Sequence, residues 1–139
     1  LEECLMALTG KKRNNDEETA KLGLEIVKFM SEKIEQFSNR YNLNFALMGT
    51  EDSELAMKFM KMDKVIYGTL KGITDKEAYT NSFEISEEDN LTKKIKIEGP
   101  YHKLTLGGHM FKIKEKMTPE KLEETIQLAK QNNIGLIRF

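Results

Sequence analysis

The chain has 139 residues, which is enough for one domain with a buried core and short for two, so a single domain over residues 1–139 is expected. Its 22 basic and 23 acidic residues give a formal net charge of -1, which argues against a nucleic-acid partner bound through a basic surface. The single cysteine excludes an internal disulfide and a zinc site of four thiolates, and it favours a reducing cytoplasm.

The sequence predicts no association with a membrane. No apolar run approaches the roughly 20 residues that span a bilayer, so no membrane partner is expected. The first residues lack the basic start and apolar core of a signal peptide. The first residue is Leu1 instead of Met, which is typical of a processed protein or of a segment of a longer one.

The first half of the chain predicts two helices with a strand between them. Apolar residues recur at steps of three and four from Asp16 to about Arg40, which predicts a long helix capped by Asn15 or Asp16. The run LNFALMG, residues 43–49, is short, apolar and ends in glycine, as a buried strand does. Thr50, followed by acidic residues, predicts the N-cap of the next helix.

The second half predicts further strands and helices in alternation. Gly99-Pro100 indicates a turn, and Thr118 followed by Pro119 indicates the start of the last helix. A polar turn at 86–89 is expected to cap a short helix. The predicted strands are 79–85, 109–114 and 134–139. Because helices separate single strands, the α/β class is predicted.

Two polar stretches are candidate binding elements. Tyr79, Thr80, Asn81 and Ser82 place an amide and three hydroxyl groups in consecutive positions, either as a strand end with local hydrogen bonds or as a cluster facing a ligand. The pair Gly107-Gly108 forms either a plain β-turn or a loop whose N–H groups face an anion. If the two stretches meet, they form one concave polar site.

Other reactive side chains give weaker signals. His102 and His109 lie seven residues apart, and no acidic residue or cysteine joins them at the spacing of metal ligands, so no metal site is predicted. Cys4 is expected to be a buried, inert thiol on an apolar helical face. Ser82 has no evident base nearby, which leaves a hydrolase as a formal alternative only. No catalytic residue is predicted in the chain.

Five segments together resemble the anaerobic, glycyl-radical ribonucleoside-triphosphate reductase family. The resemblance covers most of residues 20–139, and its most specific part is Tyr-Thr-Asn-Ser followed by Glu-Gly and then Gly-Gly. Two positions depart from the family pattern, because Glu51-Asp52 stand where Pro-Ala is expected and Ala78 replaces a first tyrosine. The segments are FALMGTEDSE, FMKMDKVIYG, YTNSFEI, KIKIEGPYHKLTLGGHMF and IGLIRF.

The resemblance implies a fold and an activity. The fold is a fragment of a glycyl-radical-enzyme-type α/β barrel, with helices alternating with short strands. The activity of the intact protein is the radical conversion of ribonucleoside triphosphates to deoxyribonucleoside triphosphates. The resemblance places Tyr79, Thr80, Asn81 and Ser82 near the nucleotide inside the barrel. Together with the glycine pair, the predicted substrate-binding residues are Tyr79, Thr80, Asn81, Ser82, Gly107 and Gly108.

The resemblance also implies cofactors and partners. A glycyl radical and a zinc ion are expected in the parent enzyme outside this segment, with no cofactor in this chain, which is expected to be inactive alone. A radical-SAM activating enzyme is the expected partner of the parent, and a homodimer is one expected assembly. The alternative is a standalone, truncated relative that binds a nucleotide or a protein partner.

Overall fold

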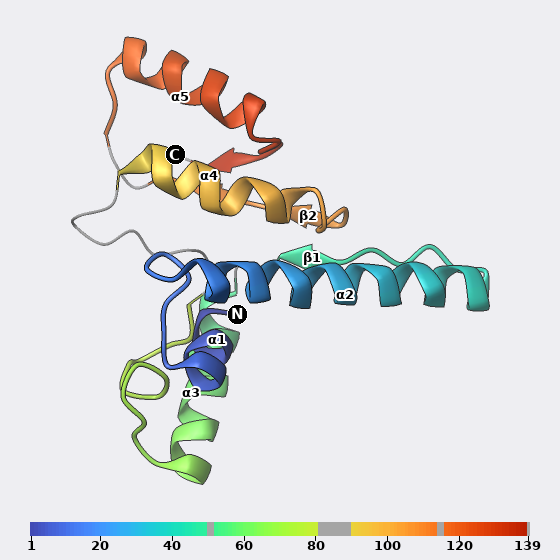
Figure 1. The fold of residues 1–139 in the computed structure, drawn as a ribbon, viewed down its shortest axis with the longest axis vertical. Helices are drawn as coiled ribbons and strands as arrows, with labels where there is room; N and C mark the ends of the chain where they lie inside the picture. The colour runs from blue at the N-terminus through green and yellow to red at the C-terminus, as the bar shows by residue number, and fades with distance from the viewer. Residues whose placement is uncertain (50–51, 81–89, 114–115, 139) are drawn as a thin grey trace. The chain divides into compact units, whose positions relative to one another are not determined.

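The computed structural model describes residues 1–49, 52–80, 90–113 and 116–138 (Figure 1). It divides the chain into two compact units, which we call unit 1 (residues 1–23 and 51–83) and unit 2 (residues 24–50 and 84–139). Within the described ranges there are five helices and four short strands, and this mixture fits the predicted α/β class. Because two compact units can lie within one domain, the expectation of a single domain stays a prediction.

Unit 1 contains the helices α1 (Glu2–Thr9) and α3 (Ser53–Tyr67). Its most deeply buried apolar side chains are Leu5 on α1 and Met60 on α3, both fully buried. The N-cap of α3 is Asp52, whose side chain accepts a hydrogen bond of 2.8 Å from the backbone N–H of Leu55. The prediction of Thr50 as the cap was therefore wrong, because a carboxylate two residues later satisfies the free N–H.

The long helix α2 (Glu17–Tyr41) contributes residues to both units and confirms the predicted helix. Its N-terminus is capped by Asp16, whose carboxylate accepts a hydrogen bond of 3.0 Å from the N–H of Thr19. The helix ends before Asn42, which adopts a positive φ of 51°. Part of its apolar stripe is exposed to solvent, with Phe29 58% exposed and Phe37 47% exposed.

Unit 2 pairs its short strands in parallel. In one pair, Met48 lies opposite Gly108, and in the other Phe111 lies opposite Ile137. The strand predicted over residues 43–49 is therefore only two residues long, and the last predicted strand is also confirmed only in part. The strands are β1 (Met48–Gly49), β2 (Gly108–His109), β3 (Phe111–Lys112) and β4 (Ile137–Arg138).

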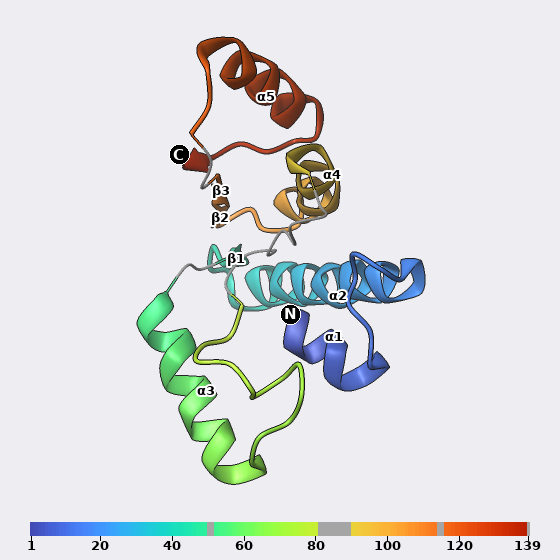
Figure 2. The ribbon, with the colours of Figure 1, turned by 90° about the vertical axis from the view of Figure 1, so that its left-hand side faces the viewer.

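The helices of unit 2 are α4 (Leu91–His102) and α5 (Pro119–Gln131), which lie side by side (Figure 2). Thr118 caps α5 as predicted, since its side chain accepts a hydrogen bond of 3.3 Å from the N–H of Lys121. Beneath the helices lies an apolar core that includes β3 and the segment before β4. Its buried members are Ile95, Phe111, Ile113, Ala129 and Ile134.

The helix α4 passes through Gly99 and Pro100, where the sequence predicted a turn. Its cap is Asn90, which accepts a hydrogen bond of 2.8 Å from the N–H of Lys93, and the predicted cap at 86–89 lies outside the described residues. The turn prediction was wrong because Gly99 is buried against α5, where a Cβ atom would overlap the carbonyl oxygen of Asn132. Tertiary packing thus favours helical backbone at a dipeptide that locally favours a turn.

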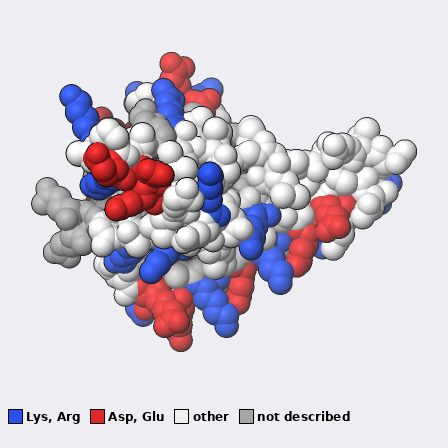
Figure 3. Space-filling view, turned by 90° about the horizontal axis from the view of Figure 1, so that it is seen from above, with Lys and Arg blue, Asp and Glu red and all other residues white. Residues whose placement is uncertain are grey.

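The charged side chains are mixed in sign on the face displayed in Figure 3, where Lys and Arg are interspersed with Asp and Glu. This distribution agrees with the near-zero net charge of the sequence. Within the described part of the chain, no helix is both long enough and apolar enough to cross a membrane.

Candidate functional site

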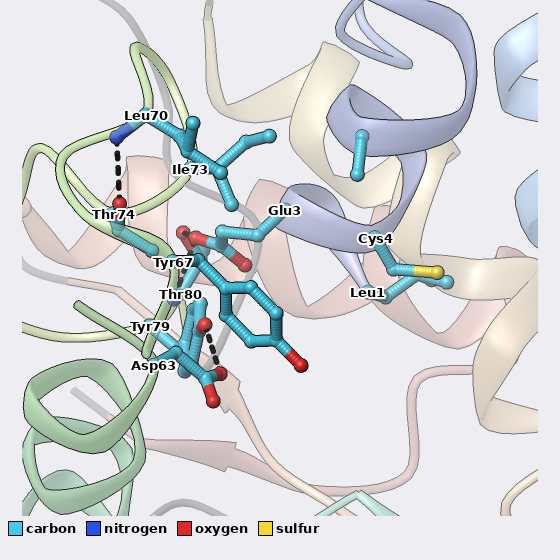
Figure 4. Close-up of a pocket in the computed structure, with 11 residues that line it drawn as sticks. Leu1, Glu3, Cys4, Asp63, Tyr67, Leu70, Ile73, Thr74, Tyr79 and Thr80 are labelled. Carbon is cyan, nitrogen blue, oxygen red and sulfur yellow. Dashed lines mark hydrogen bonds between the residues drawn. The ribbon is translucent and has the colours of Figure 1, made fainter. Parts of the chain in front are cut away.

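A pocket of about 510 Å³ lies within unit 1, which is in the range of small-molecule sites. The helix α1 supplies Glu3 and Cys4, the end of α3 supplies Asp63, and the following loop supplies Tyr79 and Thr80. Figure 4 shows Glu3, Asp63, Tyr79 and Thr80 grouped at one side of the pocket, with Leu1 and Cys4 at the other. The other lining residues are Ala7, Tyr67, Leu70, Ile73 and Thr74.

Glu3 connects α1 to the loop that carries the predicted binding residues. Its Oε1 atom accepts hydrogen bonds from the Thr80 hydroxyl at 2.5 Å and from the Thr80 backbone N–H at 2.9 Å. The Lys76 ammonium group also donates to Oε1, at 2.9 Å. The Glu3 side chain is only 6% exposed, so these three donors replace the water that burial removes.

Tyr79 makes the second polar contact in the pocket. Its phenol donates a hydrogen bond of 2.5 Å to Oδ2 of Asp63 on α3. The backbone N–H of Tyr79 donates to the carbonyl oxygen of Ala56 at 3.4 Å. Both contacts hold the loop against α3, and the Thr74 hydroxyl fixes its beginning by donating to the Gly68 carbonyl at 2.7 Å.

These contacts shift two pKa values in opposite directions. Burial alone would raise the pKa of Glu3, but the hydrogen bonds from Thr80 and Lys76 together lower it below its ordinary value of 4.5. The hydrogen bond to Asp63, with burial, raises the pKa of Tyr79 to about 12. At neutral pH, Glu3 is therefore an anion and Tyr79 a neutral donor.

The raised pKa of Tyr79 predicts a pH-dependent stability. The pKa of Tyr79 is near 10 in the unfolded chain and about 12 in the folded one. The protonated phenol therefore stabilises the fold fully below pH 10, and this stabilisation is lost as the pH rises through about 12. We expect Tyr79→Phe to lower the free energy of unfolding by about 1 kcal/mol near neutral pH, and by less at about pH 12.

Urea unfolding at both pH values measures this difference. The matched control is Tyr67→Phe, because Tyr67 lines the same pocket and is 65% exposed. An equal effect of the two substitutions, or a Tyr79→Phe effect independent of pH, would contradict the assigned role of the Asp63 contact.

Two carboxylates, those of Glu3 and Asp63, line the pocket. Among the described residues, the bonds above engage Oε1 of Glu3 and Oδ2 of Asp63, and each carboxylate has a second oxygen with acceptor capacity. Such a pocket favours ligand groups that carry hydrogen, such as sugar hydroxyls or amines. The two carboxylates outnumber the single Lys76 ammonium group that pairs with Glu3, so the net negative charge does not favour a phosphate group.

The predicted binding residues are distributed over both units. Tyr79 and Thr80 line the pocket of unit 1, outside any strand, and Asn81 and Ser82 lie outside the described residues. Gly107-Gly108 lies in unit 2, where the N–H of Gly107 donates to the Leu47 carbonyl at 2.8 Å and that of Gly108 to the Thr105 carbonyl at 3.0 Å. These two N–H groups are thus engaged within the protein, and the binding role of the glycines stays a prediction.

Glu3 and Asp63 line the pocket although no sequence pattern indicated them, and Cys4 lies elsewhere than predicted. Glu3 lies 77 residues from its partner Thr80, and no local pattern connects such distant positions. Cys4 is exposed and lines the pocket, so the prediction of a buried thiol was wrong. The reason is that α1 buries Glu3 and Leu5, which leaves Cys4 off the buried face.

The described residues form a mixed helix–strand segment, compatible with the α/β class, and unit 1 contains a pocket lined by Glu3 and Asp63. A family model described as anaerobic ribonucleoside-triphosphate reductase matches residues 1–139, and the chain belongs to this family. This agrees with the resemblance found in the sequence.

Individual relatives carry the same description. The anaerobic ribonucleoside-triphosphate reductase of Enterobacteria phage T4 is 41% identical over 91 residues, which is 64% of this chain and 15% of that protein. Those of Salmonella typhimurium and Escherichia coli are each 32% identical over 111 residues, which is 78% of this chain and 16% of each relative. The chain therefore spans about a sixth of the length of these relatives.

Proposed function

We propose that this chain forms part of a cytoplasmic anaerobic ribonucleoside-triphosphate reductase, which converts ribonucleoside triphosphates to deoxyribonucleoside triphosphates by radical chemistry. The family match over residues 1–139 is the observation that carries this proposal. The short parallel strand pairs between helices support a place in the wall of a glycyl-radical-type α/β barrel. A homodimer and a radical-SAM activating enzyme are the proposed assembly and partner of the intact protein.

The role proposed for residues 79–82 is contact with the nucleotide. Tyr79 and Thr80 lie in a pocket whose carboxylates suit the hydroxyl groups of a ribose better than a triphosphate. Asn81 carries an amide that both donates and accepts hydrogen bonds, which a sugar hydroxyl requires. Gly107 and Gly108 remain proposed contacts of the nucleotide, through close approach of the backbone.

Exposed apolar side chains support the proposal that other parts of the reductase cover this segment. Phe29 and Phe37 on α2 are about half exposed, and Val65 near the end of α3 is 88% exposed. Large apolar groups are rarely gathered on a surface that faces only water. The two-stranded sheets also leave strand edges to which further strands of a barrel can pair.

The chain's own residues do not fit the zinc site proposed for the parent enzyme. A site of four thiolates needs four cysteines, and Cys4 is the single cysteine here. The zinc ion and the glycyl radical are therefore proposed to lie outside this segment. The contribution proposed for this segment is to bind and orient the nucleotide, and the chain by itself is proposed to be inactive.

Replacement of Asn81 by alanine in the intact reductase tests the binding role. If the amide contacts the nucleotide, kcat/KM for the anaerobic reduction of ribonucleoside triphosphates should fall at least about tenfold, or roughly 1.4 kcal/mol, with little change in Tm. Steady-state kinetics and a melting curve on the same activated enzyme measure both quantities.

Asn90→Ala is the matched control. Asn90 caps α4, so its loss should lower stability by about 1 kcal/mol and leave kcat/KM nearly unchanged. If Asn81→Ala behaves like this control, with a loss of stability and no kinetic loss, the amide supports a turn and the assignment to the nucleotide is wrong.

A further inference from the structure

Two histidines and a buried glutamate meet in unit 2. Glu98 and His102 lie four residues apart on α4 and so project from the same face of the helix, and His109 lies in β2. One potential ligand atom from each residue lies within 4.8 Å of the others. The two imidazole rings stack with their centroids 4.1 Å apart and their planes 2° from parallel. Glu98 is only 1% exposed.

The pairing of β1 with β2 fixes the place of His109. Gly49 lies opposite His109 in this parallel pair. A Cβ atom at Gly49 would lie 3.2 Å from Cγ of the His109 ring, which is tighter than ordinary contact. The absence of a side chain at Gly49 therefore leaves room for the His109 imidazole, which stacks on His102.

A hydrogen bond with the Thr105 hydroxyl orients the His109 ring. The Thr105 hydroxyl donates to the Tyr101 carbonyl oxygen at 2.9 Å and lies 3.3 Å from Nδ1 of His109. The Thr105 hydroxyl has a single hydrogen, which it donates to the Tyr101 carbonyl. Nδ1 of His109 therefore carries its own proton and donates it to the Thr105 hydroxyl oxygen. This tautomer leaves the lone pair of His109 on Nε2, as in histidines whose Nδ1 is fixed by an outer hydrogen bond to hold a metal.

His102 on α4 is partly buried. Its Nε2 atom is buried and has no hydrogen-bond partner among the described residues. A buried imidazole nitrogen without a partner loses solvation, so a ligand that it can bind would stabilise it.

We propose that Glu98, His102 and His109 bind a divalent transition-metal ion, with zinc as the fitting ion. Two imidazole nitrogens and one carboxylate are a known ligand set for zinc, and they leave a fourth position for water or another ligand. Zinc ligands at about 2.1 Å in a tetrahedron lie roughly 3.4 Å apart, and an imidazole binds a metal in its own ring plane. On binding, the three side chains must therefore draw closer and the two stacked rings must turn toward the ion. The ion links α4 to β2 and is distinct from any site of four cysteines.

Zinc titration of the 139-residue chain by isothermal calorimetry tests the proposal. The chain carries Cys4→Ser, because the exposed thiol could bind zinc on its own. We expect one zinc ion per chain, and Co²⁺ in its place should give the visible absorption of a tetrahedral site. Glu98→Gln and His102→Phe should each weaken binding at least about tenfold.

The variants include controls for folding and for chance binding. His102→Phe keeps an aromatic ring stacked on His109 and removes no hydrogen bond of Nε2, so this variant is expected to fold. If circular dichroism shows that Glu98→Gln does not fold, zinc binding by His102→Phe still tests the proposed site. Glu123→Gln, on the exposed side of α5, should leave zinc binding unchanged. Absence of stoichiometric zinc binding, or equal binding by the chain with and without His102→Phe, would overturn the proposal.

Discussion

Replacing Glu3 with alanine should lower the free energy of unfolding by about 3 kcal/mol near neutral pH. The substitution removes a buried carboxylate that accepts hydrogen bonds from both Thr80 donors and from Lys76. Breaking a buried ion pair costs about 3–5 kcal/mol, and the lower end applies here because the Lys76 side chain is 36% exposed. Urea unfolding followed by circular dichroism measures the loss.

The pH dependence of the same contact has a defined sign. The folded pKa of Glu3 lies below its ordinary value of 4.5, so its stabilisation is complete above that value and is lost as the pH falls through the folded pKa. The difference in the free energy of unfolding between the unchanged chain and the Glu3→Gln variant should therefore become smaller at acidic pH. Glu35→Ala, at an exposed position of α2, is the control and should change stability by less than about 0.5 kcal/mol.

A double-mutant cycle assigns the energy to the contact with the loop. If Glu3 acts through the Thr80 hydroxyl, Glu3→Gln and Thr80→Val should show a coupling energy of about 1 kcal/mol or more. Additive effects of the two substitutions would mean that the hydroxyl contributes nothing through Glu3. The loop that carries Tyr79 and Thr80 would then be held by other contacts.

Gly99→Ala should be the second most damaging substitution, with a loss of about 2–3 kcal/mol. Within a helix this change normally adds up to about 1 kcal/mol of stability, because alanine has the higher helix propensity. Here the added Cβ would overlap the carbonyl oxygen of Asn132 and lie 3.0 Å from its Cβ, so α4 must move away from the end of α5. Thermal unfolding should show a Tm lower by several degrees.

Gly135→Ala is the matched control for this substitution. A Cβ atom at Gly135 meets no atom within 4 Å, and the residue follows the same α5 helix in unit 2. Its Tm should stay within about one or two degrees of the unchanged chain. A stabilising effect of Gly99→Ala would show that the two helices do not pack as closely as described.

The sequence by itself determined the features that depend on neighbouring residues. The period of apolar residues predicted α2, whose cap was predicted at Asn15 or Asp16 and is Asp16. Thr118 marked the start of α5. A cap and an amphipathic stripe are formed by residues within three or four positions, so they can be read along the chain. The family was also evident, because its motifs are short consecutive strings.

Only the tertiary structure decided which positions are buried and which distant groups meet. Glu3 contacts Thr80 across 77 residues, and His109 of β2 lies close to Glu98 and His102 of α4. The helix at Gly99 and the exposure of Cys4 follow in the same way from packing between elements. The conformational preference of a residue for helix or turn amounts to about 1 kcal/mol. The free energy of burying a side chain against a distant element exceeds this preference. The features that depend on such burial therefore cannot be read from neighbouring residues.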